Sequence, residues 1–499
     1  MKKINMSAKG GSAFGGKNKF YITTTLPYVN ADPHVGFARE IIGADVLARF
    51  HRDLGDEVFF NTGTDEHGLK IFRKAEELGI DVQKYCDEKA ENFKKLKETL
   101  NLTFDNFIRT TDEHHVKAAQ EFWKICEKNG DIYKKQYKIK YCVGCELEKT
   151  DSELVDGKCP LHPNMEIEII EEENYFFRFS RYQEKLLKLY EENPDFVLPK
   201  KRFNEIRSFV EMGLEDFSIS RLKEKMPWGI PVPGDDGQIM YVWFDALVDY
   251  ISALGWPTSA KASAGKPSNF EKFWPGYQLC GKDNLRQQSA MWQAMLMSAG
   301  LSASKQIFVN GFITAKGEKM SKSLGNTIDP QDMVVKFGID GTRYLLLSYG
   351  NFGEDTDLSW ELLTEKYNAD LANGLGNLLS RVITLAQKDN FSAQGGSLPR
   401  RQAGAFGGQF LDLINNVEFG QALDYIWKII RDNNKYIEEN KPWELVNNYP
   451  EKFKEIMEKL LNDLGLISKL LTPFMPEASE KIKKALETKK VEPLFQRIK

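Results

Sequence analysis

The sequence FYITTTLPYVNADPHVGFAREIIGADVLARFHRDLGDEVFFNTGTDEHG, from Phe20 to Gly68, places a helix pattern between two strand patterns. Residues 20–25 are β-branched and aromatic, which is typical of a strand. Apolar residues then recur at helical spacing within 38–50, and a second strand pattern follows at 58–60. This order of strand, helix and strand predicts an α/β fold with a doubly wound parallel, Rossmann-like sheet.

Polar residues lie where each of these strands ends. Asp32 can cap the first helix with Pro33 at its first position, and the second strand runs into a polar loop at 62–68 before a helix at 69–78. In doubly wound sheets, ligands bind at the carboxyl ends of the strands. Both loops are therefore candidates for parts of one binding site.

The pattern changes after about residue 115 and again near residue 361. Helices at 115–129 and 181–192 enclose a Cys/Lys/Glu-rich segment without a clear period, which predicts an insertion that interrupts the sheet. Strand patterns return at 239–243, 277–280 and 306–309, and helices are predicted at 361–390, 404–416, 420–440 and 451–472. The expected units are a tail (1–19), a first sheet half (20–115), the insertion (116–230), a second sheet half (231–330), a linking segment (331–360) and an all-α bundle (361–499).

The composition is that of an ordinary globular protein. Its 499 residues, 41% hydrophobic and 28% charged, suggest roughly three domains. No run of about 18 apolar residues appears, and residues 1–19 lack the apolar core of a signal peptide, so we expect a disordered tail and no membrane association. The net charge of −4 means that a nucleic-acid partner would bind local basic patches. Six cysteines are too few for a disulfide scaffold, which favours a reducing compartment, the cytoplasm.

Four residues of metal-binding type are clustered in the insertion. Cys142 and Cys145 form one pair with two residues between them, and Cys159 and His162 form a second such pair. Two pairs of this kind can converge on one tetrahedral ion, and three thiolates with an imidazole suit zinc. No coordination position would be left open, so we expect one structural zinc per chain. Four unrelated residues are the alternative.

A loop in the second sheet half, Lys319-Met320-Ser321-Lys322-Ser323, carries two lysines beside small hydroxyl residues. Glycines on both sides favour a mobile loop, suited to a polyanion such as a nucleoside triphosphate. For this loop alone, a solvated basic turn is the alternative. Far upstream, His34 and Gly36 open a helix whose N-terminal amides offer hydrogen bonds to a phosphate.

Together these two elements resemble the signature pair of class I aminoacyl-tRNA synthetases. The resemblance implies adenylation, in which a carboxylate attacks the α-phosphate of ATP and pyrophosphate leaves. Lys319 and Lys322 would hold the pyrophosphate and His34 the α-phosphate, while Mg²⁺ would accompany the ATP. The implied ATP-binding set is His34, Gly36, Phe37, Gly281, Asp283, Lys319, Ser321, Lys322 and Ser323.

Further segments resemble one family of this class, the methionyl-tRNA synthetases, from about Phe20 to the C-terminus. They are TLPYVN (25–30), GTDEHG (63–68), YVWFDA (241–246) and GKD (281–283). The resemblance implies that Asp65 holds the α-ammonium group of the amino acid and that Gly281 and Asp283 bind the ribose. Aromatic walls suit a thioether, because sulfur contacts ring edges favourably. The implied methionine pocket comprises Leu26, Tyr28, Asp65, Trp243, Ala246, Tyr250, Asn284 and Gln288; plain core packing is the alternative for Trp243 and Tyr250.

The resemblance also covers the helical end of the chain. It implies that Asn377 and Arg381 hydrogen-bond base edges of the anticodon, that Trp443 stacks on an unpaired base, and that 331–360 contacts the tRNA stem. A zinc knuckle like the one above occurs in one group of the family. The implied partners are tRNA(Met), ATP and L-methionine. The chain ends without the dimer-forming, tRNA-binding domain that some members append, which predicts a monomer.

Two positions depart from the family pattern. Phe37 stands where a polar residue, commonly His, is usual, and it cannot supply a hydrogen bond to ATP. Gln287 and Gln288 stand where many members have Phe-His, although a glutamine could still donate to the methionine sulfur. The expected function is a methionine–tRNA ligase. The alternatives are a class I synthetase for another aliphatic amino acid, whose usual editing domain would not fit this insertion, and a tRNA-binding paralogue without catalysis.

Overall fold

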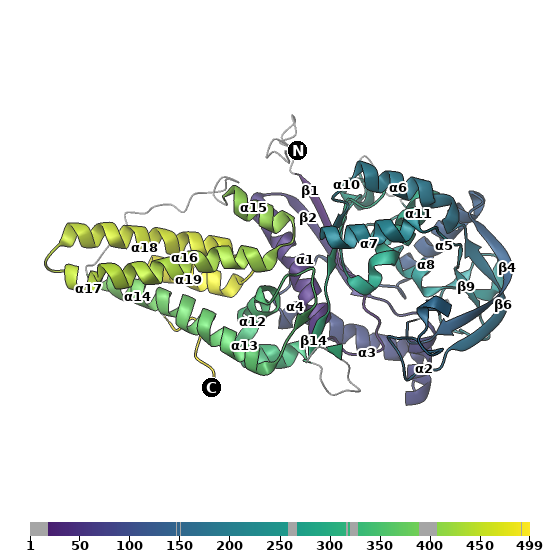
Figure 1. The fold of residues 1–499 in the computed structure, drawn as a ribbon, viewed down its shortest axis with the longest axis horizontal. Helices are drawn as coiled ribbons and strands as arrows, with labels where there is room; N and C mark the ends of the chain where they lie inside the picture. Colours follow the sequence, from purple (N-terminus) through teal and green to yellow (C-terminus); the bar gives the residue numbers. More distant parts are fainter. Residues whose placement is uncertain are drawn as a thin grey trace.

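The computed structural model describes residues 18–145, 147–149, 151–257, 267–315, 318–319, 328–388, 407–490 and 492–499. An α/β part built on a parallel sheet lies beside an elongated bundle of C-terminal helices (Figure 1). The predicted tail lies outside the described residues as far as residue 17. Ser321, Lys322 and Ser323 of the lysine-containing loop also lie outside them.

Six parallel strands form the central sheet in the order β3-β2-β1-β12-β13-β7. The order reverses between β1 and β12, which is the switch point where doubly wound sheets bind ligands. The predicted fold class is confirmed, with the insertion between the two halves of the sheet. The strands are β1 (Lys19–Thr23), β2 (Glu57–Thr64), β3 (Asn106–Arg109), β7 (Val197–Leu198), β12 (Tyr277–Gly281) and β13 (Gln306–Asn310).

Helix α1 (Val35–Leu54) joins β1 to β2 and is buried along most of its length. The helices predicted at 69–78, 115–129 and 181–192 are confirmed as α2, α5 and α6. The remaining helical elements of the α/β part connect the strands. They are α2 (Leu69–Leu78), α3 (Val82–Lys94), α4 (Leu96–Thr99), α5 (Glu113–Lys128), η1 (Asp151–Glu153), η2 (Phe179–Tyr182), α6 (Gln183–Glu192), α7 (Lys200–Glu211), α10 (Asn269–Phe273), η3 (Lys282–Asn284), η4 (Gln287–Met291) and α11 (Trp292–Ser298).

The start of α1 differs from the prediction that Asp32 caps it. The cap is His34, whose Nδ1 accepts a hydrogen bond from the backbone N–H of Gly36 at 3.0 Å. The Asp32 carboxylate instead accepts from Lys89 Nζ (2.8 Å) and Asn92 Nδ2 (3.0 Å) of α3. A charge-assisted bond to a lysine outweighs a local cap, and the sequence alone could not show that α3 packs there.

The insertion contains antiparallel β structure that the sequence pattern did not reveal. The long strands β4 and β6 pair from Ile132–Phe177 to Tyr141–Glu168. β4 is rich in lysine and β6 in glutamate, and Lys138 Nζ lies 3.2 Å from Glu171 Oε2 across the two strands. Such polar residues hide the alternation that identifies a strand. The sheet has the order β5-β4-β6-β8, with β4 (Ile132–Cys142), β5 (Leu147–Lys149), β6 (Glu168–Phe177) and β8 (Phe217–Ser218).

The strand predicted at 239–243 is wrong in its second half. Its first residues end β11, which belongs to a separate antiparallel sheet and not to the parallel one. Val242–Ala246 forms helix α8, because the helical turn carries Asp245 to two buried histidines that donate to its carboxylate. These partners are distant in sequence, so the local apolar pattern could not reveal them. The elements here are β9 (Ser220–Leu222), β10 (Pro231–Val232), β11 (Asp235–Met240), α8 and α9 (Asp249–Ser252).

An all-α bundle follows the sheet, as predicted, and its last helix, α19, was not predicted. None of the described helices is both long and apolar enough to cross a lipid bilayer. Three short strands lie between the sheet and the bundle: β14 (Ile313–Ala315), β15 (Glu318–Lys319) and β16 (Thr356–Asp357). The helices are α12 (Pro330–Ser348), α13 (Trp360–Lys366), η6 (Tyr367–Gly376), α14 (Asn377–Gln387), α15 (Gly408–Asn415), α16 (Phe419–Asn440), α17 (Pro442–Leu445), α18 (Pro450–Leu471) and α19 (Pro476–Thr488).

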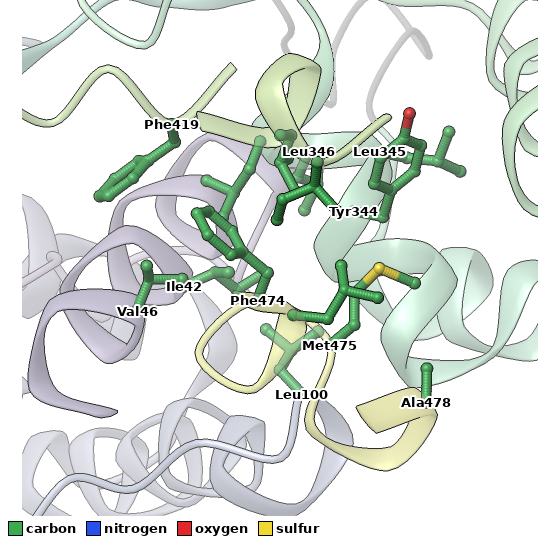
Figure 2. Close-up of a cluster of buried hydrophobic side chains, with 14 of the residues drawn as sticks. Ile42, Val46, Leu100, Tyr344, Leu345, Leu346, Phe419, Phe474, Met475 and Ala478 are labelled. Atoms are coloured by element: carbon green, nitrogen blue, oxygen red, sulfur yellow. The ribbon is translucent and has the colours of Figure 1, made fainter. Parts of the chain in front are cut away.

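One apolar cluster joins the bundle to α1. Figure 2 shows Ile42 and Val46 of α1 in the same cluster as Phe474, which lies in the turn before α19. Next to it, the fully buried Arg343 of α12 pairs with Asp45 of α1 at 2.8 Å and donates from Nε to the carbonyl oxygen of Phe474. Removing one partner of a buried ion pair is strongly destabilising, so this contact fixes the bundle relative to the sheet.

Candidate functional site

The carboxyl ends of β1 and β2 continue into one paired segment. Tyr28 and Asp65 form an isolated parallel bridge, in which Val29 N donates to Asp65 O (3.2 Å) and Asp65 N donates to Pro27 O (3.0 Å). Leu26 and Asp65 are buried. Two separate motifs of the sequence therefore place a tyrosine, a leucine and a carboxylate together at the switch point.

Helix α8 carries the predicted aromatic residue Trp243. Trp243 and Tyr28 both pack against the same small apolar cluster of Tyr141, Tyr241 and Val242. Ala246 follows one turn later, and Tyr250 lies on α9; both are buried. Tyr28 thus links the carboxylate of Asp65 to the predicted apolar residues.

A buried carboxylate and two histidines hold α8 against the rest of the site. Asp245 Oδ2 lies 2.7 Å from His67 Nδ1, and its Oδ1 lies 2.9 Å from His115 Nε2. Burial raises the pKa of Asp245, but the two histidines outweigh burial and hold that pKa below its ordinary value. The sequence analysis gave no role to these three residues. The only available signal was the position of His67 in the polar loop that also contains Asp65.

His34 is held at the N-terminus of α1 with one ring nitrogen engaged. Its Nδ1 accepts from Gly36 N, so in the neutral ring the proton is on Nε2, which becomes the donor. A Cβ at residue 36 would lie 2.7 Å from His34 Cε1, so this turn requires glycine. Phe37 is buried and packs edge-on against Phe93, with 5.7 Å between the ring centroids. Its side chain therefore belongs to the core.

The end of β12 forms a tight turn at the same edge of the sheet. A Cβ at Gly281 would lie 2.6 Å from Asp283 Oδ1, so glycine allows this carboxylate to fold back over the turn. Asp283 itself is exposed, and Asn284 is half-buried. Lys282 Nζ pairs with Asp355 Oδ2 at 2.6 Å, which ties the turn to the segment before β16.

Glu40, two turns into α1, is a buried carboxyl that the sequence analysis missed. Its Oε1 accepts from the backbone N–H of Thr25 at 2.7 Å. With its amide nitrogen facing these acceptors, Asn310 donates to Cys280 O (2.8 Å) and to Glu40 Oε2 (3.2 Å). Burial raises the pKa of Glu40 to about 8. Glu40 therefore connects β1, α1 and β13 beneath the site.

The lysine-containing loop begins beyond β13. Lys319 lies in β15, where it pairs antiparallel with Thr314 of β14. Met320, Ser321, Lys322 and Ser323 lie outside the described residues, as noted above. The loop therefore begins after β13 and its antiparallel partner strand β14, following the carboxyl end of a strand of the parallel sheet.

The predicted metal ligands come together in the insertion. The ligand atoms of Cys142, Cys145, Cys159 and His162 all lie within 4.8 Å of one another. Cys145 Sγ is 3.4 Å from Cys159 Sγ and 3.2 Å from His162 Nδ1. A Cβ at Gly144 would lie 2.5 Å from His162 Cγ, so the turn between the first two cysteines requires glycine. This group could hold one tetrahedral metal ion.

The three predicted RNA-reading residues share one end of the bundle. Arg381 Nη1 lies 2.8 Å from Glu438 Oε1, and its guanidinium lies 6.0 Å from the ring centroid of Trp443. Trp443 is 40% exposed although it is a large aromatic residue. Asn377 is exposed one helical turn before Arg381 and lines a cavity of ≈ 570 Å³ beside the C-terminal segment. Arg381 and Trp443 therefore lie beside each other, and Asn377 is exposed on the same helix as Arg381.

Gln287 and Gln288 are both buried, in the π-helical turn η4. Gln288 Nε2 donates to the hydroxyl oxygen of Tyr250. The Gln288 amide is therefore hydrogen-bonded to Tyr250, another residue of the predicted methionine pocket.

Comparison with known proteins identifies relatives over nearly the whole chain. The family described as "tRNA synthetases class I (M)" matches residues 20–167 and 163–383, and "Anticodon binding domain of methionyl tRNA ligase" matches residues 408–495. The methionine–tRNA ligase of Thermotoga maritima is 43% identical over 93% of this chain and 74% of its own length. That of Thermosynechococcus vestitus is 43% identical over 93% of this chain and 89% of its own.

A solved structure has the same architecture. Mycobacterium tuberculosis methionyl-tRNA synthetase in complex with methionyl-adenylate superposes with a TM-score of 0.86 and 38% sequence identity. The match covers 93% of each chain, so it includes both the α/β part and the bundle.

Proposed function

The chain belongs to the methionyl-tRNA synthetase family, and from this premise we propose how its own residues perform the family's reaction. The chain is a methionine–tRNA ligase, which converts methionine and ATP to methionyl-adenylate and pyrophosphate and then transfers the methionyl group to the 3′-terminal adenosine of tRNA(Met). In the first step, a carboxylate oxygen of methionine bonds to the α-phosphorus of ATP while the bond to pyrophosphate breaks. The protein mainly positions the reactants and neutralises charge.

The Tyr28–Asp65 bridge is the observation that carries the assignment of the amino-acid site. The Asp65 carboxylate binds the α-ammonium group of methionine by a charge-assisted hydrogen bond. Tyr28 and Trp243 then face the thioether; both pack against one apolar cluster, and Tyr28 is paired with Asp65. The other pocket residues are Leu26, Ala246, Tyr250, Asn284 and Gln288.

The nucleotide lies across the switch point. His34 donates from Nε2 to an α-phosphate oxygen, and Gly36 lets the nucleotide approach the first backbone amides of α1. Gly281 and Asp283 bind the ribose. Mg²⁺ would accompany ATP and supply positive charge to its phosphates. The pyrophosphate is held by Lys319 and Lys322, with Ser321 and Ser323 as further donors, whereas Phe37 supports the site only by packing.

The metal held by Cys142, Cys145, Cys159 and His162 is one structural zinc ion. Three thiolates and an imidazole are the ligands that zinc prefers, and they leave no open position for catalysis. When bound, zinc would supply cross-links among the turns at the tip of the insertion. The cysteines outside this group, such as Cys126 and Cys280, are buried among apolar residues and take no part.

The bundle binds the anticodon of tRNA(Met). Trp443 stacks on an unpaired base, while Asn377 and Arg381 bond base edges; the exposure of Trp443 beside Arg381 supports this. We assign 361–499 as the anticodon-binding unit, 331–360 as the stem contact, 116–230 as the insertion, and 20–115 with 231–330 as the catalytic unit. A monomeric state and a cytoplasmic location stay predictions, which sedimentation and cell fractionation would test.

ATP–pyrophosphate exchange with a panel of amino acids tests the function. Methionine should support exchange with a kcat/KM far above that for leucine, isoleucine or valine. If one of these three is preferred, the chain is a synthetase for another aliphatic amino acid. If none supports exchange although the protein binds tRNA(Met), it is a paralogue without catalysis.

A further inference from the structure

Lys282 stands between Gly281 and Asp283 in the turn after β12, but its ammonium group binds a different segment of the chain. Its Nζ donates to Asp355 Oδ2 at 2.6 Å and lies 4.1 Å from the centroid of the Phe312 ring. Phe312 immediately precedes β14, and Asp355 immediately precedes β16. One ammonium group therefore contacts both segments that lead into the short sheet of β14, β15 and β16.

The Asp355 carboxylate joins the same two segments. Its Oδ1 accepts from the backbone N–H of Phe312 at 3.0 Å, while its Oδ2 accepts from Lys282. Burial raises the pKa of Asp355, but the hydrogen bonds from Lys282 and Phe312 outweigh burial and hold that pKa below its ordinary value. The carboxylate is therefore charged at neutral pH, and both of its oxygens are engaged.

The segments on either side of this pair form a parallel ladder. Thr356 N donates to the carbonyl oxygen of Phe312 at 2.8 Å, and β16 then runs parallel to β14. A Cβ at Gly311 would overlap the carbonyl group of Glu354, so the two chains approach closely and this position requires glycine. The position of β16 therefore determines the position of β14.

Strand β14 in turn holds β15, which contains Lys319, a residue assigned above to the pyrophosphate. The backbone of Thr314 pairs antiparallel with that of Lys319, and Thr314 Oγ1 donates to Asp357 Oδ1 of β16 at 2.9 Å. A continuous path of contacts thus leads from Lys282, beside the turn assigned to the ribose, through Asp355 to the strand of Lys319.

We propose that the Lys282–Asp355 pair sets the position of Lys319 relative to the ribose-binding turn, so that the two ends of the nucleotide are held in one geometry while pyrophosphate leaves. This role rests on the proposed function of Lys319 and of the turn. Lys282 and Asp355 are positioning residues, because they act through β14 and β16. Direct contact of Lys282 with a phosphate is the alternative, and it would require Nζ to leave the Asp355 carboxylate.

Two single variants and their combination test the pair by ATP–pyrophosphate exchange with methionine. Lys282→Met and Asp355→Asn should each lower kcat about fivefold, near the upper limit for a partly exposed ion pair. The double variant should be no slower than either single variant, because both changes remove the same contact. Lys282→Arg keeps a cation at this position and should retain most of the rate.

The Michaelis constants distinguish positioning from a general loss of structure. In Lys282→Met and Asp355→Asn, the KM for pyrophosphate should rise, because Lys319 is displaced from its place relative to the nucleotide. The KM for methionine should change little, since Asp65 and helix α8 are not part of this path.

The neighbouring ion pair of Lys201 and Glu354 is the matched control. Glu354 precedes Asp355 in the chain, and its Oε2 lies 3.2 Å from Lys201 Nζ, which ties the same segment to α7 instead of to the turn after β12. Glu354→Gln and Lys201→Met should leave kcat and both KM values unchanged. Thermal unfolding of each variant shows that the protein compared is folded.

Four outcomes would overturn the positioning role. Normal exchange by Asp355→Asn together with slow exchange by Lys282→Met would show that Lys282 binds the nucleotide itself. Losses that multiply in the double variant would show two independent roles, equal losses in Glu354→Gln would show a merely structural tether, and wild-type exchange by every variant would show no role at all. Failure of the proposed function looks different, because the wild-type protein would then not support exchange with methionine.

Discussion

Asp245 Oδ2 lies 2.7 Å from His67 Nδ1, although 178 positions separate the two residues. The bond connects helix α8, which carries Trp243 and Ala246, to the loop that carries Asp65. The other carboxylate oxygen of Asp245 is bonded to His115. One buried anion therefore connects helix α8 to the loop whose carboxylate, Asp65, is proposed to bind the ammonium group.

Asp245→Asn should weaken the contact between helix α8 and the loop that carries Asp65. An amide has only one accepting oxygen, so one of the two histidines loses its acceptor. We expect a loss of about 1–3 kcal/mol of unfolding free energy. The KM for methionine should rise about tenfold, as measured by exchange.

Asp249→Asn is the matched control for Asp245→Asn. Burial raises the pKa of Asp249 well above its ordinary value, so its carboxyl group is protonated and an amide replaces it with little change. The depressed pKa of Asp245 gives the opposite behaviour. Its stabilisation is present above the pKa of the unfolded chain and is lost as pH falls through the lower folded pKa. The loss of unfolding free energy caused by Asp245→Asn should therefore become smaller below about pH 4. An equal loss of unfolding free energy in Asp245→Asn and Asp249→Asn would refute this role of Asp245.

Glu40→Gln should change how stability depends on pH. The pKa of Glu40 is about 8 in the folded protein, above its ordinary value, so the folded state binds the proton more tightly. Its contribution is full below the unfolded pKa and is lost as pH rises toward 8, by up to about 1.4 kcal/mol per pH unit. Urea unfolding between pH 5 and 9 should show this fall for the wild type and a flatter profile for the variant. Glu455→Gln, an exposed substitution, should follow the wild type.

Lys322→Ala should slow adenylation while leaving the fold intact. Removing one group that stabilises transition-state charge typically costs about 10²–10³ in rate. Exchange kinetics measure the loss, and the thermal midpoint should stay within a degree or so of the wild type, since lysine side chains are rarely part of an apolar core. Lys336→Ala, on the exposed face of α12, should exchange normally. Near-normal exchange by Lys322→Ala would remove the assigned role of the loop.

Cys145→Ser should release the metal. Purified wild-type protein should contain about one zinc ion per chain by elemental analysis. The variant should lose most of it and unfold at a lower temperature, because folding and metal binding are coupled. Cys86→Ala removes a buried cysteine outside the cluster and should keep the zinc. Full zinc content in Cys145→Ser would show that the four ligands are misassigned.

Trp443→Ala should impair tRNA charging and spare amino-acid activation. Base–aromatic stacking is worth about 1–3 kcal/mol per base, so the KM for tRNA(Met) should rise at least several-fold. Tyr449→Ala is the control, because Tyr449 is another aromatic residue of the bundle and is 63% exposed. Equal losses of exchange and charging in Trp443→Ala would instead indicate a structural role.

Local patterns predicted those elements whose determinants are close in sequence. The order of β1, α1 and β2, the metal-ligand pairs and most of the bundle helices follow from spacings within about 20 residues. The predictions that failed concern residues whose decisive contacts lie elsewhere in the chain. Asp32 bonds to α3 while His34 caps α1, and the segment at Val242–Ala246 is helical with Asp245 bonded to His67 and His115. β4 and β6 stay hidden because lysines and glutamates that pair across strands mask the period.

The sequence by itself determined the α/β class, the Cys₃His group and the identity of most residues in the proposed site, because each depends on residue type and short-range spacing. The tertiary structure alone decided which carboxyl groups are ionised and which nitrogen of His34 carries the proton. These properties depend on burial and on partners brought together from distant parts of the chain. A buried polar group must satisfy its hydrogen bonds with whatever the fold places beside it, and only the folded chain specifies that neighbour.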